Sequence, residues 1–423
     1  MLGLRSWAGG HFGNGPKAKE LPQGVLLHVP KTGGTSLNYM ILNAYPANRA
    51  VVLSNHIDGV IPEKSNHDFI SGHFRWSFVE KQGLADRRLI TFLRDPVSRA
   101  LSQFYFMKMN QTLDLFQNDR MVYTPSTRAK VLSTIGKVRE LGLSEFLDKE
   151  PALAQALLGN WHTWILSQDH EKIEDLNEKD LDFAKSILDR CHFVGICERM
   201  NESLEGFARS MGWPFVAPHR ENTTEGKRAE GEHSPKVLQR LREITALDYE
   251  LYQHALKIHE QQIQNPPTQD FPLPDATKYT PADPILGGGW YTREGYRGEW
   301  YCWTGPSEEA FLLLKTGIRT SANLTIHLLK PHLEEITERL ALTFNGEPLD
   351  HLVLRSTSGI ALRARVSETI MEKANGRIWL GIHTGPTTPV SEMNPGSMDP
   401  RKVGVCLLSL NLAKVTTFWG QGA

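Results

Sequence analysis

Cysteine is scarce in this chain, with four residues among 423. So few cysteines cannot supply the dense disulfide framework that stabilises small secreted domains. Hydrophobic runs long enough to cross a bilayer are also missing, and no segment has the pattern of a signal peptide. We therefore expect no transmembrane segment. The length instead supports two or three domains, each with an ample core.

An excess of charge of either sign is also absent. The 47 Lys and Arg residues almost balance the 48 Asp and Glu residues, and the net charge is -1. Because binding to nucleic acid depends on a strongly basic surface, we expect no nucleic-acid partner. The 16 histidines form no H-E-x-x-H motif, and the cysteines form no C-x-x-C motif. We therefore expect no metal site.

The most informative stretch is a turn between an apolar strand and a helix. Residues 25–29 predict the strand, and residues 37–44 predict the helix. The turn between them contains one lysine, two glycines and three hydroxyl residues: Lys31, Thr32, Gly33, Gly34, Thr35 and Ser36. Glycines let backbone amides approach an anion closely, and a helix N-terminus adds oriented dipoles. The turn therefore predicts a cradle for a phosphate-like group, with an ordinary glycine-rich turn as the alternative.

The order of residues in this turn differs from that of the nucleotide-binding P-loop. The P-loop pattern is G-x-x-x-x-G-K-[ST], in which the lysine follows the second glycine. Here Lys31 precedes Gly33 and Gly34, and the position of the first glycine falls within the strand. This inversion argues against a nucleoside triphosphatase.

A second strand-to-helix unit follows. Residues 89–93 predict a short buried parallel strand, and Asp95 and Pro96 are typical of a helix N-cap and first helical position. Arg94 stands at the end of the strand, and Ser102 lies two turns into the helix. The planar guanidinium of Arg94 can bind a phosphate through two parallel hydrogen bonds. The alternative is a surface arginine paired with Asp95 and an incidental serine.

Together the two units resemble the sulfotransferases that use 3′-phosphoadenosine-5′-phosphosulfate (PAPS) as sulfuryl donor. Residues 30–36, Pro-Lys-Thr-Gly-Gly-Thr-Ser, are similar to the loop that binds the 5′-phosphosulfate in that family. The preceding His-Val pair resembles the branch of heparan and chondroitin O-sulfotransferases. The resemblance implies that residues 31–36 bind the phosphosulfate and that Arg94 and Ser102 bind the 3′-phosphate. It also implies that no metal ion is needed.

A histidine between the two units is the candidate catalytic base. Residues 69–78 resemble the segment that carries the catalytic histidine of the hexuronic 2-O-sulfotransferases. Sulfuryl transfer to a hydroxyl needs a base for the acceptor proton, and histidine titrates near neutral pH. We assign this role to His73, and stabilisation of the leaving phosphate to Lys31. In that branch a second histidine stands two residues before the base, where this sequence has Ser71. The alternative for His73 is a buried structural histidine.

The alternation of strands and helices in the first part of the chain predicts a parallel sheet with helices on both faces. Ligands of such sheets bind at the carboxyl ends of the strands, where both units have their polar residues. We therefore expect a P-loop-like α/β sulfotransferase domain at residues 22–262, after an N-terminal tail at 1–21. The resemblance covers roughly residues 22–260. It implies that the polar loop at 219–228 closes over the donor.

The pattern changes beyond this domain. Residues 263–286 are rich in proline and predict a semi-rigid linker. At 287–423 apolar residues alternate with polar ones over short runs separated by turns, which predicts a C-terminal β-sandwich accessory domain. Aromatic residues are concentrated near its start, at 290–291 and 300–303. We favour core packing as their role, with stacking on a sugar ring as the alternative.

The sequence therefore predicts an enzyme that transfers a sulfuryl group from PAPS to an acceptor hydroxyl. We expect a glycan acceptor, or otherwise another hydroxyl-bearing molecule. Two alternatives stay open: a Mg-dependent nucleotide or sugar kinase, and a non-catalytic protein that binds nucleotide and glycan. Golgi sulfotransferases carry an N-terminal membrane anchor, whereas we expect no transmembrane segment in this sequence. We therefore expect a cytoplasmic protein of bacterial type, with a soluble form of a membrane-anchored enzyme as the alternative.

Overall fold

The computed structural model describes most of the chain. It covers residues 21–53, 67–110, 112, 125–168, 170, 172–214, 233–264, 271–329, 335–357, 359–394, 396–397, 399 and 401–415. The loop at 219–228, which we expect to close over the donor, lies outside these residues. All of the N-terminal tail except Leu21 also lies outside them.

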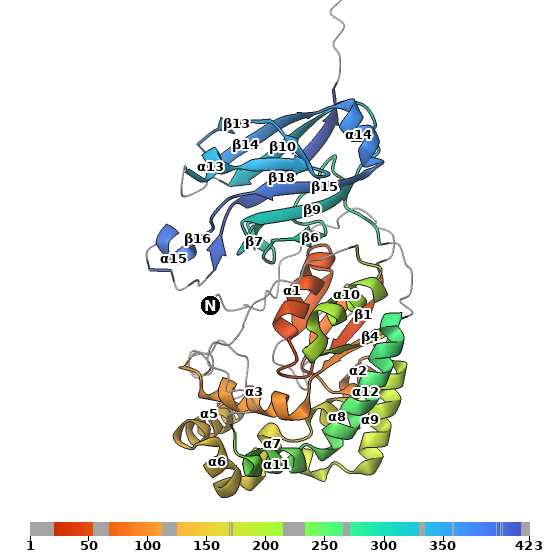
Figure 1. The fold of residues 1–423 in the computed structure, drawn as a ribbon, viewed down its shortest axis with the longest axis vertical. Helices are drawn as coiled ribbons and strands as arrows, with labels where there is room; N and C mark the ends of the chain where they lie inside the picture. The colour runs from red at the N-terminus through yellow and green to blue at the C-terminus, as the bar shows by residue number, and fades with distance from the viewer. Residues whose placement is uncertain are drawn as a thin grey trace, which may run out of the picture.

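Five parallel strands form the sheet of the first unit (Figure 1). They are β1 (Gly24–Leu27), β2 (Ala50–Leu53), β3 (Phe69–Gly72), β4 (Arg88–Leu93) and β5 (Phe193–Ile196). Their order is β2-β3-β1-β4-β5, so β1 pairs with β3 on one side and with β4 on the other. Leu27 is the register partner of Gly72 in β3 and of Thr91 in β4. The three central strands therefore run to the same edge, and the predicted α/β architecture with a parallel sheet is confirmed.

Helices cover both faces of this sheet. They are α1 (Gly34–Ala44), α2 (Trp76–Lys81), α3 (Pro96–Lys108), α5 (Pro125–Glu140), α6 (Leu143–Lys149), α7 (Pro151–Leu158), α8 (Trp161–Leu166), α9 (Glu178–Arg190), α10 (Met200–Ser210), α11 (Pro235–Ile244) and α12 (Ala246–Gln264). Because side chains of a strand alternate in direction, Val25 and Leu27 join a core with α2, α8, α9 and α12. Leu26 joins a different core with α1 and α10. The remaining helices α3, α5, α6, α7 and α11 share a third core.

The last helical segment of this unit differs from the sequence expectation. The apolar periodicity over residues 235–259 predicts one helix, whereas the structure has two, α11 and α12, separated at Thr245. The Thr245 hydroxyl donates to the Leu241 carbonyl at 2.8 Å, and its amide donates to the same oxygen at 3.1 Å. This local side-chain bond is a known competitor of regular helical bonding.

Antiparallel sheets make up the C-terminal unit, which lies at the top of Figure 1. One has the order β13-β14-β10-β18-β8-β7, and the other has the order β12-β11-β15-β9-β6. The strands are β6 (Gly287–Gly288), β7 (Glu294–Tyr296), β8 (Glu299–Trp303), β9 (Glu309–Lys315), β10 (Ala322–Leu329), β11 (Ala341–Phe344), β12 (Glu347–Leu349), β13 (His351–Arg355), β14 (Gly359–Val366), β15 (Arg377–His383) and β18 (Cys406–Lys414). The pair β16 (Thr388–Pro389) and β17 (Lys402–Val403) is separate. The helices are α13 (Glu335–Arg339), α14 (Glu368–Ala374) and α15 (Val390–Met393).

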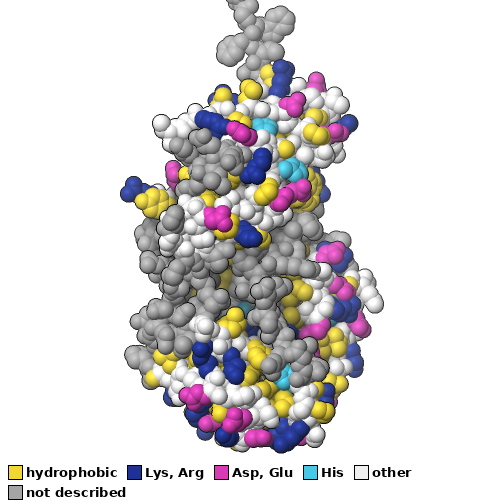
Figure 2. Space-filling view, turned by 60° about the vertical axis from the view of Figure 1, so that its left-hand side comes forward, with side chains coloured by type: hydrophobic (Ala, Val, Ile, Leu, Met, Phe, Trp, Pro, Cys, Tyr) yellow, Lys and Arg dark blue, Asp and Glu magenta, His cyan; other side chains and the backbone are white. Residues whose placement is uncertain are grey.

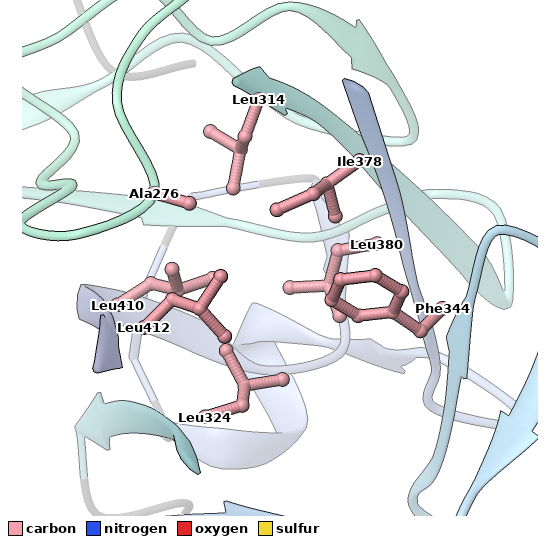
Figure 3. Close-up of a pocket in the computed structure, with 8 residues that line it drawn as sticks. All are labelled: Ala276, Leu314, Leu324, Phe344, Ile378, Leu380, Leu410 and Leu412. Carbon is pink, nitrogen blue, oxygen red and sulfur yellow. The ribbon is translucent and has the colours of Figure 1, made fainter. Parts of the chain in front are cut away.

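Side chains from both large sheets meet in one apolar core. In Figure 3, leucine, isoleucine and phenylalanine side chains from the two sheets point toward one another. The space that they enclose is too tight to admit a water molecule. It is therefore a packing space and offers no room for a ligand.

The segment expected to be a linker packs against the C-terminal unit where the structure describes it. Asp275 forms a β-bridge with Lys315 of β9, and Tyr279 forms one with Leu410 of β18. Ala276, Tyr279 and Ile285 are buried in the core of the C-terminal sheets. Part of the segment that the sequence predicts as a semi-rigid linker therefore contributes side chains to that core.

The visible surface carries a mixture of charges. On the face shown in Figure 2, Lys and Arg side chains are interspersed with Asp and Glu side chains over both units. Within the described part of the chain, no helix is both long enough and apolar enough to cross a membrane.

Candidate functional site

Polar residues that follow β1, β3 and β4 meet at the carboxyl edge of the sheet. The Arg94 guanidinium, at the end of β4, donates from Nη1 to the Lys31 carbonyl at 3.3 Å. His73, just after β3, lies with Nδ1 2.7 Å from the His28 carbonyl, just after β1. The structure therefore brings together the lysine turn, the arginine and the histidine that the sequence singles out.

The turn after β1 has the backbone conformation of an anion cradle. Lys31 and Gly33 have φ angles of 73° and 84°, in the left-handed region. Helix α1 then begins at Gly34, with Gly33 as its N-cap. The first amides of a helix have no intrahelical acceptor, and they carry the positive end of the helix dipole. The amides of Gly34, Thr35 and Ser36 can therefore donate to an anion.

A close neighbour requires glycine at position 34, and the left-handed φ angle of 84° favours glycine at position 33. A Cβ atom on Gly34 would lie 1.6 Å from Cε1 of the His28 ring, and one on Gly33 would lie 2.3 Å from Cε of Met200. No side chain larger than hydrogen fits at Gly34 unless the imidazole moves. The turn is thus held between β1 and the start of α10.

The three hydroxyls of the turn differ in their availability. The buried Thr32 hydroxyl donates to the Val29 carbonyl at 2.8 Å, so it stabilises the turn. This differs from our expectation that it serves as a donor to the anion. Thr35 is exposed and Ser36 is half-buried, so their hydroxyls are nearer to solvent.

The Lys31 ammonium group lies over the ring of Phe106 in α3, with Nζ 3.9 Å from the ring centroid. A cation over an aromatic face is attracted by the ring quadrupole. This contact joins the lysine turn to the helix that follows Arg94. It holds a positive charge at the edge of the sheet where the strands end.

The contact with the His28 carbonyl fixes the tautomer of the His73 imidazole. A carbonyl oxygen can only accept a hydrogen bond, so Nδ1 carries the proton toward His28, and the lone pair of Nε2 is free. The His28 and His73 rings are stacked, with centroids 4.2 Å apart and an interplanar angle of 28°. Burial lowers the pKa of His73, and the charge of Lys31 lowers it further, against the opposing effect of the hydrogen bond to His28. Burial also lowers the pKa of His28 well below its ordinary value.

The unit formed by β4 and α3 is built as its sequence predicts. The Asp95 carboxylate accepts a hydrogen bond from the Ser98 amide at 2.8 Å, and Pro96 is the first residue of α3. Arg94 lies directly before this cap, and Ser102 is buried within the helix. The cap fixes the direction in which α3 leaves the sheet, and therefore the positions of both predicted 3′-phosphate ligands.

Glu198 is a site residue that the sequence analysis missed. Its carboxylate lies 3.8 Å from Nε of Arg94 and accepts hydrogen bonds from the Asp95 amide and the Tyr252 hydroxyl. Burial raises the pKa of Tyr252, and the nearby Glu198 charge raises it further. Glu198 follows β5 on the same edge as the other residues. The rule that ligands lie at the carboxyl ends of parallel strands could have found it.

The structure also places three further features that the sequence singles out, namely Ser71, Asn201 and the aromatic pair at 290–291. Ser71, at the position where the related branch has a second histidine, donates to the Asn38 side chain at 2.7 Å. Asn201 is of a residue type that often caps helices, and the sequence predicts it as the N-cap of the helix after β5, but it lies inside α10, whose N-cap is Arg199. Trp290 and Tyr291 are buried, which agrees with core packing, and Trp290 donates to the Phe311 carbonyl at 2.8 Å.

The described residues include no cluster of three or more His, Cys, Asp or Glu side chains with the geometry of a metal site. The ligand groups at the edge of the sheet are instead amides, a lysine, an arginine and hydroxyls. Such donors suit an anionic ligand.

Comparisons with known proteins agree with the family that the motifs suggest. The profile of the Sulfotransferase family matches residues 23–255. No curated protein matches the sequence.

Two solved structures show limited similarity. The crystal structure of mouse sulfotransferase SULT7A1 complexed with PAP is 15% identical over 46% of this chain and 61% of that chain, with a TM-score of 0.26. A family GH115 4-O-methyl-α-glucuronidase with specificity for decorated arabinogalactans is 10% identical over 69% of this chain and 40% of that chain, with a TM-score of 0.20. The chain therefore spans less than two thirds of the length of either protein. Because the family profile covers more than half of its 423 residues, the chain belongs to the sulfotransferase family.

Proposed function

We propose that this protein is an enzyme that transfers a sulfuryl group from PAPS to a hydroxyl group of an acceptor. The observation that carries the proposal is the meeting of Lys31, His73 and Arg94 at one edge of the sheet. The bond from Arg94 to the Lys31 carbonyl, at 3.3 Å, links the two proposed anion sites directly. A single nucleotide with phosphate groups at both its 5′ and 3′ positions can then bridge them.

The donor is held by residues of two strand-to-helix units. The amides of Gly34, Thr35 and Ser36, the hydroxyls of Thr35 and Ser36 and the Lys31 ammonium bind the 5′-phosphosulfate, while Arg94 and Ser102 bind the 3′-phosphate. The fit is supported by the left-handed φ angles of Lys31 and Gly33 and by the start of α1 at Gly34, which leaves the first amides of the helix without intrahelical acceptors. PAPS supplies the sulfuryl group, and the protein orients it.

His73 acts on the acceptor. Its Nε2 atom takes the proton of the attacking hydroxyl, while the Nδ1 proton stays on the hydrogen bond to His28. The Lys31 ammonium stabilises the negative charge that develops on the leaving phosphate. These roles require no metal ion.

The acceptor that we propose is a carbohydrate of the hexuronic type, as in the heparan and chondroitin O-sulfotransferase branch. The proposal is supported by residues 69–78 and by the His-Val pair before the lysine turn. We also propose that the C-terminal sheets are a β-sandwich accessory domain, since their inward side chains share one core.

A ligand-binding experiment tests the donor. Thermal shifts should show that adenosine 3′,5′-bisphosphate stabilises the protein at concentrations at which ATP and AMP do not. Arg94→Met should abolish this selectivity, since it removes the charged donor for the 3′-phosphate. Arg209→Met is the matched control, because Arg209 is an exposed arginine of α10 that pairs with Glu205.

Two outcomes would contradict the proposal. Equal stabilisation by ATP, dependent on magnesium, would favour the kinase alternative. An Arg94→Met variant with unchanged selectivity would show that Arg94 does not bind the 3′-phosphate of the donor. Transfer of labelled sulfate to uronic-acid-containing glycans, measured with and without a chelator, then tests the reaction and its acceptor.

A further inference from the structure

The C-terminal end of α1 is capped by a residue of the other unit. Arg293 donates from Nη2 to the carbonyls of Leu42, Asn43 and Tyr45, at 3.0, 3.3 and 2.7 Å. Its Nη1 donates to the Ala282 carbonyl at 3.1 Å. The last carbonyls of a helix have no intrahelical donor, so one guanidinium satisfies acceptors that the helix itself cannot.

This arginine remains charged although it is enclosed. Burial lowers its pKa to about 10, which still leaves the guanidinium protonated at neutral pH. A positive charge at the C-terminal end of a helix interacts favourably with the negative end of the helix dipole. Arg293 therefore provides both hydrogen bonds and charge to α1.

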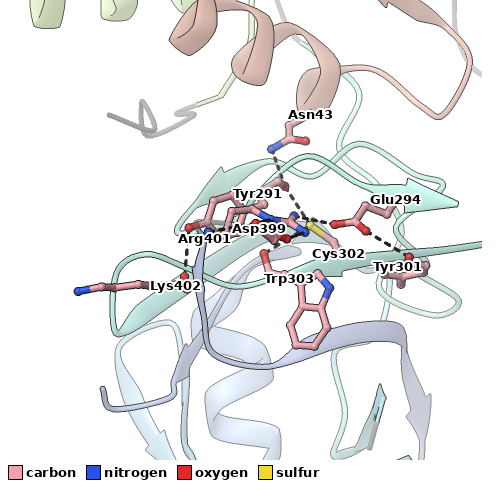
Figure 4. Close-up of polar contacts among 9 residues, drawn as sticks. All are labelled: Asn43, Tyr291, Glu294, Tyr301, Cys302, Trp303, Asp399, Arg401 and Lys402. Atoms are coloured by element: carbon pink, nitrogen blue, oxygen red, sulfur yellow. Dashed lines mark hydrogen bonds and ion pairs between the residues drawn. The ribbon is translucent and has the colours of Figure 1, made fainter. Parts of the chain in front are cut away.

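Further contacts join the same end of α1 to the C-terminal unit. The Asn43 amide side chain donates to the Tyr291 carbonyl at 3.3 Å, as Figure 4 shows, and the Asn43 carbonyl accepts from the Ile285 amide at 2.7 Å. Leu286 and Leu313 lie in the same apolar core as the buried face of α1. The helix is thus fixed at this end by polar and apolar contacts.

The opposite end of α1 is the proposed donor site. The helix has 11 residues, so about 16 Å separates its two ends. Its first amides, after the lysine turn, are the ones that point toward the phosphosulfate. A tilt of α1 at the capped end moves these amides, because a short helix behaves as a stiff element.

We propose that Arg293 is a positioning residue for the donor loop, and that the C-terminal unit acts on the donor site through α1. The inference rests on the proposed function in one respect, which is that the loop binds an anionic donor. Arg293 touches no reacting group. Its effect is on the position and the dipole of the helix that presents the loop.

The test uses the full chain and three variants. Arg293→Met removes the hydrogen bonds and the charge, and Arg293→Lys keeps the charge. Arg401→Met is the control, since Arg401 is a partly enclosed arginine of the same unit that donates instead to Asp399 and Glu294 (Figure 4). The readouts are hydrogen exchange of the α1 amides and the affinity for adenosine 3′,5′-bisphosphate.

We expect Arg293→Met to speed exchange in α1 and to weaken bisphosphate binding about fivefold, which corresponds to the loss of about 1 kcal/mol from a helix-end charge. Arg293→Lys should restore part of both. Arg401→Met should lower the melting temperature and change neither readout.

Identical α1 exchange in the Arg293→Met and Arg401→Met variants would overturn the inference, whether or not the bisphosphate binds. A wild-type protein that fails to bind the bisphosphate would instead contradict the proposed function. In that case the exchange of α1 still decides whether Arg293 fixes the helix.

Discussion

At the scale of single residues, His73 experiences opposing influences on its proton. Burial is the largest and lowers its pKa, the hydrogen bond to the His28 carbonyl raises it, and the charge of Lys31 lowers it. The net effect is a pKa below the ordinary value of 6.5. The imidazole is therefore neutral at pH 7, with the Nε2 lone pair available for an acceptor proton.

A pH profile tests this assignment. We expect kcat/KM for sulfuryl transfer to be flat through neutral pH and to fall with acid only below about pH 6.5, because the base must be neutral in the free enzyme. His73→Ala should lower kcat by about 10²- to 10⁴-fold, the usual contribution of a general base, and leave bisphosphate affinity unchanged.

His254→Ala is the control for this prediction, because His254 lies on α12 and pairs with the exposed Asp189. It should leave both the rate and the profile as in the wild type. His73 is not the base if kcat/KM falls on the acid side with a midpoint above pH 6.5. The same conclusion follows if the His73→Ala variant keeps a kcat within twofold of the wild type.

The contact between His28 and Gly34 gives a second prediction. Gly34→Ala places a Cβ inside the His28 ring, so it should cost about 1 to 3 kcal/mol of unfolding free energy and weaken bisphosphate binding. Replacing the ring as well, in a Gly34→Ala/His28→Ala double variant, should recover part of the lost stability. Urea unfolding and calorimetric titration measure the two effects.

Gly136→Ala is the matched control for the glycine substitution. No atom lies within 4 Å of a Cβ at Gly136, which is in the interior of α5. The substitution should therefore be neutral or slightly stabilising, as expected from helix propensity. If the double variant is no more stable than Gly34→Ala alone, the steric explanation is wrong.

At the scale of elements, the sequence predicts best where a boundary has a local cause. Asp95 and Pro96 start α3 as expected, because an N-cap side chain and a proline act within one turn. The Asn345–Gly346 hairpin is similar, since both residues adopt the positive φ angles that their types tolerate. The helix after the lysine turn begins at Gly34 instead of Leu37, because the polar residues of the cradle already belong to its first turn.

Elements that depend on distant partners are less predictable. The break between α11 and α12 places Asp248 where its carboxylate accepts from the amides of His162 and Thr163, at the start of α8. A 3₁₀ turn at Cys197–Arg199 leads directly into α10, so Asn201 is not needed as a cap. The local apolar periodicity predicts neither the break between α11 and α12 nor the 3₁₀ turn before α10.

The candidate site also combines features that local sequence predicts with features that depend on distant residues. Its charged and glycine residues follow from two motifs, whereas the packing of Phe106 under the Lys31 ammonium has no signal in the sequence. The stacking of His28 on His73 joins residues 45 positions apart, and the register of β1 and β3 makes it possible. Side-chain contacts between strands depend on this register, which a single sequence does not specify.

At the scale of the whole molecule, the first unit contains several buried or half-buried histidines. Burial is the largest cause of a lowered pKa for each of them: His28, His73, His162, His192 and His259. The lowered value is about 4 for His162, which has no exposed surface. The native state therefore favours the neutral form of all these side chains.

This predicts a loss of stability in mild acid. Below about pH 6.5 the unfolded chain binds protons that the native histidines do not, so the unfolding free energy falls as the pH decreases toward the native pKa values, near 4 for His162. Each such histidine contributes up to about 1.4 kcal/mol per pH unit. The urea concentration at the midpoint of unfolding should fall steeply as the pH is lowered from 7 to 5 in the wild type. It should fall less steeply in His162→Gln, while His254→Gln should show the same dependence on pH as the wild type. Equal slopes for the wild type and His162→Gln would show that His162 is protonated in the native state, contrary to its enclosure.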